Sequence, residues 1–113
     1  MRWILRSKIN KATVTEANVH YIGSIGIDEN LIDKAGLMLG EKVLVTDQTS
    51  GERLETYVIE EKRGSGIVCM NGPAALLIKK GDVVVIMGFE LADAPIKAQK
   101  ILVDKDNKFV KYQ

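Results

Sequence analysis

The sequence predicts an all-β fold, a small β-barrel, from three observations. Roughly seven short segments are rich in β-branched residues, only two short segments have helical spacing, and glycine-containing turns recur along the chain. The 113 residues are enough for one hydrophobic core and too few for two. We find no internal repeat, linker or low-complexity stretch, so a single domain over residues 1–113 is expected.

The first part of the chain is expected to supply strands and one short helix. Residues 3–15 alternate Ile, Val and Thr with charges, which predicts a long strand or two strands with a bend. A break at 16–18 leads to a predicted short strand at 20–22. Asp28 is placed to cap a helix of about two turns, and Gly36 is placed to end it.

The middle of the chain is typical of a β-hairpin. Strands are predicted at 42–46 and 52–59, on either side of a turn at 47–51. Along the second strand, the period of two residues would place Arg53 and Tyr57 on one face together with the glutamate between them.

In the last third of the chain we predict a loop, two strands and a small helix. The C-terminal residues can be interpreted in two ways. A flexible loop at 62–66 precedes a buried strand at 67–70, and Pro73 opens a second small helix. The apolar run 83–89 predicts a central strand. Residues 100–112 form either a last hairpin or one strand followed by a loose tail.

Composition excludes several functional classes. The net charge of +1 leaves no electrostatic footprint for nucleic acid or an anionic membrane. The apolar run Val83–Met87 is too short to span a bilayer, and the basic start lacks the long apolar core of a signal peptide. With one cysteine and one histidine, a tetrahedral metal site is not expected. A soluble, cytoplasmic protein is therefore predicted.

The Gly23–Ser24 bond is a candidate for chemistry on the chain itself. A serine hydroxyl is a weak nucleophile toward the preceding carbonyl, and glycine there removes the side chain that would crowd the attack. Attack converts the amide to an ester, and elimination then leaves a ketone at a new chain start. Taken alone, Gly-Ser is more typical of an ordinary turn. Ser65, between two glycines, is the alternative self-cleaving serine.

Three side chains could serve a substrate that carries a carboxylate. Arg53 can fork onto a carboxylate through two hydrogen bonds, and Lys8 offers a compact positive charge. The alternative for both is a solvated strand residue. Tyr57, on the same strand face as Arg53, could donate a proton to a carbanion, or simply pack its ring with the hydroxyl at the rim.

Three polar residues could serve the cleavage. Thr56 and Asn71 lie in apolar surroundings, and either could hydrogen-bond the oxyanion formed when Ser24 attacks. Asn71 could also cap the helix that begins near Pro73. His20 is a candidate general base, although a lone histidine is more often structural. Cys69, between apolar residues, is predicted to be a buried structural thiol.

Several segments occur in the order and spacing of one known family: Ser7-Lys8-Ile9, Ala12-Thr13-Val14-Thr15, His20-Tyr21-Ile22-Gly23-Ser24, Gly51 to Tyr57, Arg63-Gly64-Ser65-Gly66 and Asn71-Gly72-Pro73-Ala74-Ala75. Together they resemble the pyruvoyl-dependent aspartate 1-decarboxylases of bacteria, over about residues 1–104. The resemblance implies a six-stranded double-psi β-barrel with two short helices. It also implies a homotetramer that converts L-aspartate to β-alanine for pantothenate biosynthesis.

The resemblance further implies a proenzyme that is cut between Gly23 and Ser24 into chains 1–23 and 24–113. Ser24 would become a covalent pyruvoyl group, whose ketone condenses with the substrate amine, so neither a metal nor pyridoxal phosphate is needed. The implied roles are carboxylate binding by Lys8 and Arg53, proton donation by Tyr57, cleavage and substrate contact by Thr56, positioning of the cleavage site by Asn71, and lining of the substrate by Gly72, Pro73 and Ala74.

The chain departs from the family pattern at two positions. Asn10 stands where members usually have histidine, and Pro73 stands where they have alanine, which removes a backbone N–H. The tail after Asp104 is short, so a contact with a maturation factor is not assumed. These departures support the alternative interpretation, a non-catalytic β-barrel binding module that keeps the Gly23–Ser24 bond intact.

Overall fold

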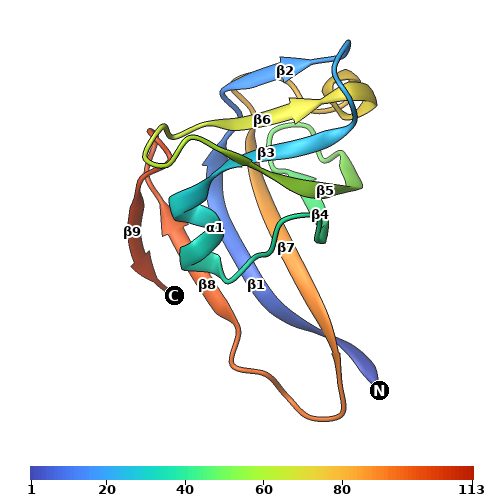
Figure 1. Ribbon diagram of the computed structural model, residues 1–113, viewed down its shortest axis with the longest axis vertical. Helices are drawn as coiled ribbons and strands as arrows, with labels where there is room; N and C mark the ends of the chain where they lie inside the picture. The colour runs from blue at the N-terminus through green and yellow to red at the C-terminus, as the bar shows by residue number, and fades with distance from the viewer.

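A computed structural model describes residues 1–113. Nine strands surround one core, and one α-helix and one 3₁₀ helix accompany them (Figure 1). In chain order the elements are β1 (Arg2–Thr13), β2 (Glu16–Asn18), β3 (Ser24–Asp28), α1 (Glu29–Ala35), β4 (Lys42–Asp47), β5 (Arg53–Glu61), β6 (Val68–Asn71), η1 (Gly72–Leu76), β7 (Val83–Ala92), β8 (Gln99–Val103) and β9 (Phe109–Tyr112). The all-β class is confirmed.

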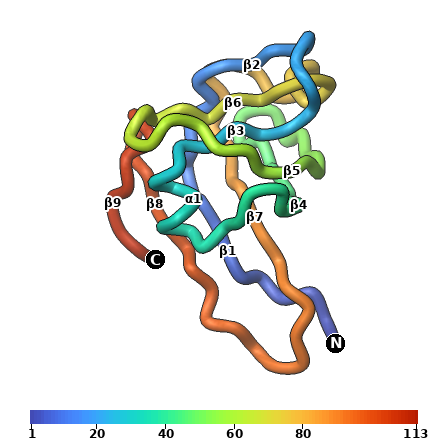
Figure 2. The backbone as a smooth tube through the Cα atoms, viewed as in Figure 1, coloured from blue at the N-terminus to red at the C-terminus, as the bar shows by residue number.

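The strands form one sheet in the order β2-β6-β3-β5-β4-β7-β1-β8-β9. Strands β1 and β2 follow each other closely in the chain, yet they lie near opposite ends of this order. Between them, Thr15 binds Val68 twice: its N–H donates to the Val68 carbonyl at 2.8 Å, and its hydroxyl accepts the Val68 N–H at 3.0 Å. Because this one stretch of chain pairs with strands near both ends of the order, the sheet closes into a barrel (Figure 2).

The strand count is nine rather than the expected six. Six consecutive strands, β6-β3-β5-β4-β7-β1, occupy the centre of the order, and β2 and the β8–β9 hairpin extend it at the two ends. The hairpin interpretation of the C-terminal residues is confirmed, because β8 and β9 pair antiparallel. The long β1–β7 pair projects below the rest of the barrel (Figures 1 and 2).

Strand β1 is long and bent, as the sequence predicts. Its register against β7 shifts between Leu5 and Ser7 and again between Ile9 and Ala12. Lys11, inside the second shift, has a φ of 62°. Such bulges leave residues unpaired and increase the local twist, which lets a single strand follow the curve of a barrel.

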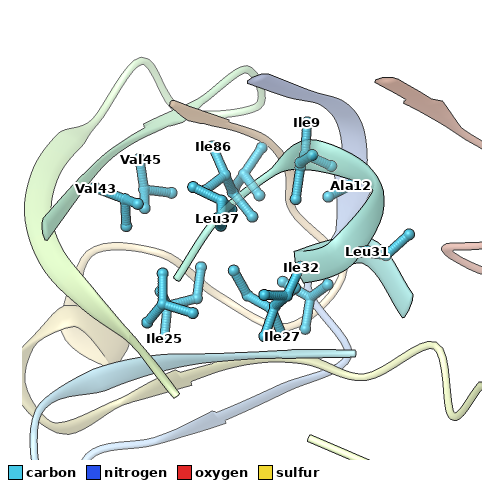
Figure 3. Packing of buried hydrophobic residues seen from close by; sticks show 14 of the residues in the cluster. Ile9, Ala12, Ile25, Ile27, Leu31, Ile32, Leu37, Val43, Val45 and Ile86 are labelled. Carbon is cyan, nitrogen blue, oxygen red and sulfur yellow. The ribbon is translucent and has the colours of Figure 1, made fainter. Parts of the chain in front are cut away.

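The core is a cluster of 19 buried apolar residues. Alternating positions of the strands point inward, and α1 covers them from one side (Figure 3). Each fully buried aliphatic side chain of this kind stabilises the fold by roughly 1.5–3 kcal/mol. The labelled members are Ile9, Ala12, Ile25, Ile27, Leu31, Ile32, Leu37, Val43, Val45 and Ile86.

Asp28 caps α1 and also fixes a distant loop. Its Oδ1 accepts the Asn30 N–H at 2.8 Å, and Gly36 ends the helix at a φ of 71°, both as predicted. The same carboxylate accepts N–H bonds from Gly64 at 3.0 Å and Gly66 at 2.8 Å. Burial raises the pKa of Asp28, but these backbone donors outweigh burial and hold the pKa below its ordinary value. The glycine-rich loop is therefore tied to the helix start.

The predicted short strand at 20–22 is wrong. The chain turns there instead, and the strand lies at 16–18, where a break was expected. Asn18 causes the turn: its side-chain oxygen accepts the His20 N–H at 3.0 Å, and its carbonyl accepts the Tyr21 N–H at 3.4 Å. The second helix is a 3₁₀ turn that ends at Leu76. The α-helix has only seven residues, and no helix here has the length and apolarity to cross a membrane.

The last residue of β4, Asp47, carries a buried carboxyl group. Asp47 is 2% exposed, and its Oδ1 accepts the N–H groups of Thr49 at 2.7 Å and Ser50 at 3.2 Å. Its Oδ2 is buried without a donor when the group is ionised. Burial raises the pKa of Asp47, and the Asp82 carboxylate beside it raises that pKa further. A protonated Asp47 instead donates to Asp82.

We expect Asp47→Asn to stabilise the fold at neutral pH. The raised pKa means that the carboxyl group stabilises the native state when protonated, and that this contribution is lost as the pH rises through the native pKa. An amide keeps the Oδ1 bonds and supplies an N–H to Asp82 at every pH, so the gain at pH 7 should be about 1–3 kcal/mol.

Denaturant unfolding at pH 7 and near pH 4 measures this difference. The gain should shrink at the lower pH, where the wild-type carboxyl group is itself protonated. Asp106→Asn, at an exposed aspartate, is the matched control and should change little. An equal gain at both pH values would contradict the argument.

Candidate active site

The Gly23–Ser24 bond lies at the entry to β3, beside a cleft of about 390 Å³. The walls come from β5 and from the junction of β6 with η1, because β3 pairs with both β5 and β6. The residues that line it are Gly23, Leu54, Glu55, Thr56, Tyr57, Asn71, Pro73, Ala74 and Leu77. Of the predicted site residues, the structure thus gathers most in one place.

Ser24 is buried and its hydroxyl is oriented. The residue is 1% exposed, and its Oγ accepts a hydrogen bond from Asn71 Nδ2 at 3.0 Å. The hydroxyl donates to the Ile22 carbonyl at 3.4 Å, across the Gly23 residue that it would attack. An amide N–H aimed at Oγ stabilises the negative charge left there when the hydroxyl gives up its proton, and in a buried site this effect is larger than in water.

The side chain of Asn71 does not cap the helix that follows it. Asn71 has the extended backbone of an N-cap, with φ −113° and ψ 143°, but its side chain makes no capping bond to η1. The carboxamide points to Ser24 and to Cys69 instead, and Cys69 Sγ donates to Asn71 Oδ1 at 3.2 Å. The capping interpretation is wrong because the side chain is used in these two other contacts.

Gly72 is required for two steric reasons. Its φ is 72°, in the left-handed region that disfavours side chains. A Cβ on Gly72 would also lie 2.7 Å from the Cα and 2.9 Å from the N of Gly23, closer than real contacts allow. The backbone at the start of η1 therefore lies directly against Gly23, the residue before the candidate cleavage bond.

Pro73 and Ala74 continue that wall. Pro73 stands at the start of η1, and its ring lies 3.8 Å from the place where a Gly23 Cβ would be. Proline has no backbone N–H, so this part of the cleft presents an apolar ring where most residues would offer a donor.

Strand β5 shows the predicted alternation. Arg53, Glu55 and Tyr57 are exposed, whereas Leu54, Thr56 and Val58 are half-buried or buried. Thr56 lies opposite Val43, and Tyr57, 39% exposed, lies opposite Lys42 on β4. Thr56 and Tyr57 both line the cleft.

Neither predicted carboxylate-binding residue lines the cleft. Arg53 directly precedes the lining residue Leu54, so it borders the site. Lys8 lies in one row across the outer face with Met87, Leu44 and Glu55. Three strand spacings separate Lys8 from Glu55, or about 14 Å along the sheet. One chain therefore does not bring Lys8 to Ser24.

The remaining candidates lie elsewhere. His20 is in an exposed turn and is not among the hydrogen-bond partners of Ser24. Ser65 is exposed, and its hydroxyl accepts the Ile67 N–H at 3.2 Å, as in an ordinary turn. Asn10 Nδ2 donates to Gln113 Oε1 at 2.8 Å, so this departure from the family pattern faces the chain end.

The sequence did not indicate three lining residues. Glu55 could have been found, because it alternates with Arg53 and Tyr57; it forms an ion pair with Lys42 at 2.9 Å. Leu54 and Leu77 gave no signal beyond being apolar. The structure gathers no three His, Cys, Asp or Glu side chains in an arrangement suited to a metal ion.

Comparison with known proteins then decides the family. Residues 1–110 match the family described as aspartate decarboxylase. The chain belongs to the aspartate decarboxylase family. Among its relatives named aspartate 1-decarboxylase, one from Neisseria meningitidis serogroup C is 50% identical over 111 residues, or 95% of this chain and 87% of the relative. One from Caldicellulosiruptor saccharolyticus is 50% identical over 112 residues, or 96% and 88%.

The fold of this aspartate decarboxylase family member also has a solved counterpart. The crystal structure of the rationally designed mkDPBB_sym_86 protein, a double-psi β-barrel, matches with a TM-score of 0.54 at 23% identity. The match covers 72% of this chain and 95% of the designed one. It shows the fold alone, and it confirms the double-psi β-barrel that the resemblance implied. The non-catalytic module is not favoured by these findings.

Proposed function

We propose that this chain is a cytoplasmic, self-processing proenzyme whose pyruvoyl group is made from its own Ser24. Family membership assigns the reaction: the chain is an aspartate decarboxylase that converts L-aspartate to β-alanine and carbon dioxide for pantothenate biosynthesis. One observation carries the proposal of self-processing. The buried Ser24 hydroxyl accepts an N–H from Asn71 and lies beside the peptide bond of Gly23.

The residues around Ser24 suit the formation of a pyruvoyl group from the chain itself. Glycine precedes it, a donor is fixed on its oxygen, and the cleft of about 390 Å³ beside it has room for an amino acid. A pyruvoyl ketone supplies the electron sink that decarboxylation of an amino acid requires. The residues of this chain then bind the substrate, exclude water and move protons.

The proposed cleavage proceeds in three steps. Ser24 Oγ adds to the Gly23 carbonyl carbon, the Gly23–Ser24 C–N bond breaks, and the nitrogen takes a proton, which leaves an ester. Loss of the Ser24 Cα proton then breaks the Ser24 Cβ–Oγ bond, so Oγ leaves in a Gly23 carboxylate and residue 24 becomes a dehydroalanine. Water replaces its nitrogen, which leaves as ammonia. Asn71 serves the first step by orienting Oγ and stabilising the negative charge left there as the hydroxyl gives up its proton. Thr56, which lines the same cleft, is proposed to hydrogen-bond the oxyanion that forms on the Gly23 carbonyl oxygen.

We expect purified wild-type protein to yield two pieces, residues 1–23 and residues 24–113. The second piece should be lighter than a serine start by one ammonia, because the amino group of residue 24 has left. Intact mass spectrometry measures both, and Ser24→Ala should remain one full-length chain.

Incubation of the purified chain alone separates two routes. Cleavage in isolation indicates that the chain suffices, and cleavage only with added cell extract indicates a maturation factor. A chain that stays full length under both conditions would overturn the proposal of self-processing. The family assignment would remain.

Tyr57 is proposed as the proton donor for the carbon that has lost carbon dioxide. It lines the same cleft as Gly23 and is partly exposed, so its hydroxyl can reach a bound substrate. Arg53 borders the cleft on the same strand face and is proposed to bind a substrate carboxylate. Gly72, Pro73 and Ala74 are proposed to form the substrate wall.

Tyr57→Phe should leave folding and chain cleavage intact and lower kcat about 10²–10⁴-fold, the usual effect of a positioned acid. Release of β-alanine by fully cleaved protein is the measurement. Tyr112→Phe, at an exposed tyrosine on β9, is the control and should turn over normally. Near-normal turnover by Tyr57→Phe would assign the proton to water or another residue.

A homotetramer is proposed because one chain leaves two features incomplete. Strand β7 is apolar on both faces: Val84 and Ile86 point into the core, and Met87 and Phe89 lie half-buried on the outside near Trp3, which is 69% exposed. An apolar outer face of this kind favours association. Lys8 is also too far from the cleft of its own chain, so we propose that it serves the cleft of a neighbouring copy.

Co-expression of Lys8→Ala with Ser24→Ala tests this arrangement. Each variant alone should be inactive, for lack of the ammonium or of the pyruvoyl group. If a site takes Ser24 from one copy and Lys8 from another, random assembly of equal amounts restores about a quarter of the sites. Assay of β-alanine formation by the mixed assembly measures this. No activity in an assembly shown to contain both chains would place Lys8 outside the neighbouring cleft.

A further inference from the structure

We propose that Cys69 is a positioning residue for chain cleavage, because its thiol holds the Asn71 carboxamide in the orientation that presents an N–H to Ser24. This inference rests on the proposed self-processing. It assigns a task to a side chain that neither the sequence pattern nor the resemblance placed in the site.

Cys69, Asn71 and Ser24 are linked in series by two hydrogen bonds. Cys69 Sγ lies 3.2 Å from Asn71 Oδ1, and Asn71 Nδ2 lies 3.0 Å from Ser24 Oγ. Strand geometry produces this line, because residues 69 and 71 share one face of β6 and lie opposite Gly26 and Ser24 of β3. All three side chains are buried, so water does not compete for these bonds.

The orientation of the Asn71 carboxamide depends on the Cys69 thiol. A carboxamide has an accepting end and a donating end, and rotation by half a turn would exchange them. Rotation would aim Oδ1 at Ser24 Oγ, where it would oppose developing negative charge, and would set N–H groups against the S–H group. A donor at position 69 therefore favours the orientation that assists the attack.

Cys69 is a donor at physiological pH. Burial raises the pKa of its thiol to about 11, and the nearby carboxylates of Glu16 and Glu61 raise it in the same direction. Glu16 Oε2, 3.9 Å from Sγ, is a second acceptor for the one thiol proton, but the contact with Asn71 Oδ1 at 3.2 Å is much shorter. Glu61 lies over Gly26, where there is no side chain to exclude it. The sulfur thus keeps its proton, and its task is to donate a hydrogen bond.

Pulse-labelled chains, followed by gel and mass analysis, give the rate of cleavage. We expect Cys69→Ala to slow cleavage roughly 3- to 10-fold, the effect of losing one neutral hydrogen bond. Cys69→Ser restores a donor and should cleave at close to the wild-type rate. Val68→Ala is the matched control, since Val68 lies on the same strand but faces the core; it should lower stability without slowing cleavage.

Wild-type cleavage rates in Cys69→Ala, or equal slowing in Cys69→Ser and Cys69→Ala, would overturn the proposal. A second test uses Asn71→Ala, in which the Cys69→Ala change should add nothing because the two residues act as a unit. Additive slowing would mean that Cys69 acts by another route.

One measurement is independent of whether the wild-type chain cleaves. Neutron crystal structures of uncleaved Ser24→Ala, with and without Cys69→Ala, distinguish Oδ1 from Nδ2 in the Asn71 carboxamide. The single variant should keep Oδ1 on the thiol, and the double variant should lose that fixed orientation. An unchanged carboxamide in the double variant would overturn the proposal, whereas a full-length wild-type chain would overturn only the self-processing on which it rests.

Discussion

The antiparallel pairing of β3 with β6 is the constraint on which the site depends. It sets Ser24 opposite Asn71 and Gly26 opposite Cys69, so one short ladder supplies the nucleophile, its donor and the thiol behind the donor. The chain then leaves β6 through Gly72, whose positive φ folds it back over Gly23. A side chain on Gly72 would push this part of the chain away from Gly23.

Elements with strong local signals could be predicted from the sequence. Asp28 and Gly36 bound α1, the turn at 47–51 joins β4 to β5, and the apolar run at 83–89 lies within β7. The failure at 20–22 has a local cause as well. Tyr21 and Ile22 are typical strand residues, but the side chain and carbonyl of Asn18 turn the chain before they can pair, and Ile22 is left 76% exposed.

The residues of the candidate site could be predicted from the sequence, but their arrangement in space could not. The motifs named Ser24, Thr56, Tyr57 and Asn71, and all four lie at one cleft or on its wall. The contact between Ser24 and Asn71 spans 47 positions and depends on long-range strand pairing, which no local pattern encodes. For the same reason Asn71 was a candidate helix cap. Lys8 and Arg53 were both candidates to bind a substrate carboxylate, although the sheet sets Lys8 on a distant strand.

The continuity of β1 and β2 has a consequence for the proposed cleavage of the 23–24 bond. Both strands then belong to the 23-residue piece, whereas their partners β6, β7 and β8 belong to the other. The small piece would close the barrel without a covalent link to the rest, held by strand pairing and by core side chains such as Ile9 and Ala12. Folding of the precursor is unimolecular, but reassembly of the separated pieces is bimolecular and therefore sensitive to dilution. The proposed self-processing therefore requires the barrel to close before the chain is cut.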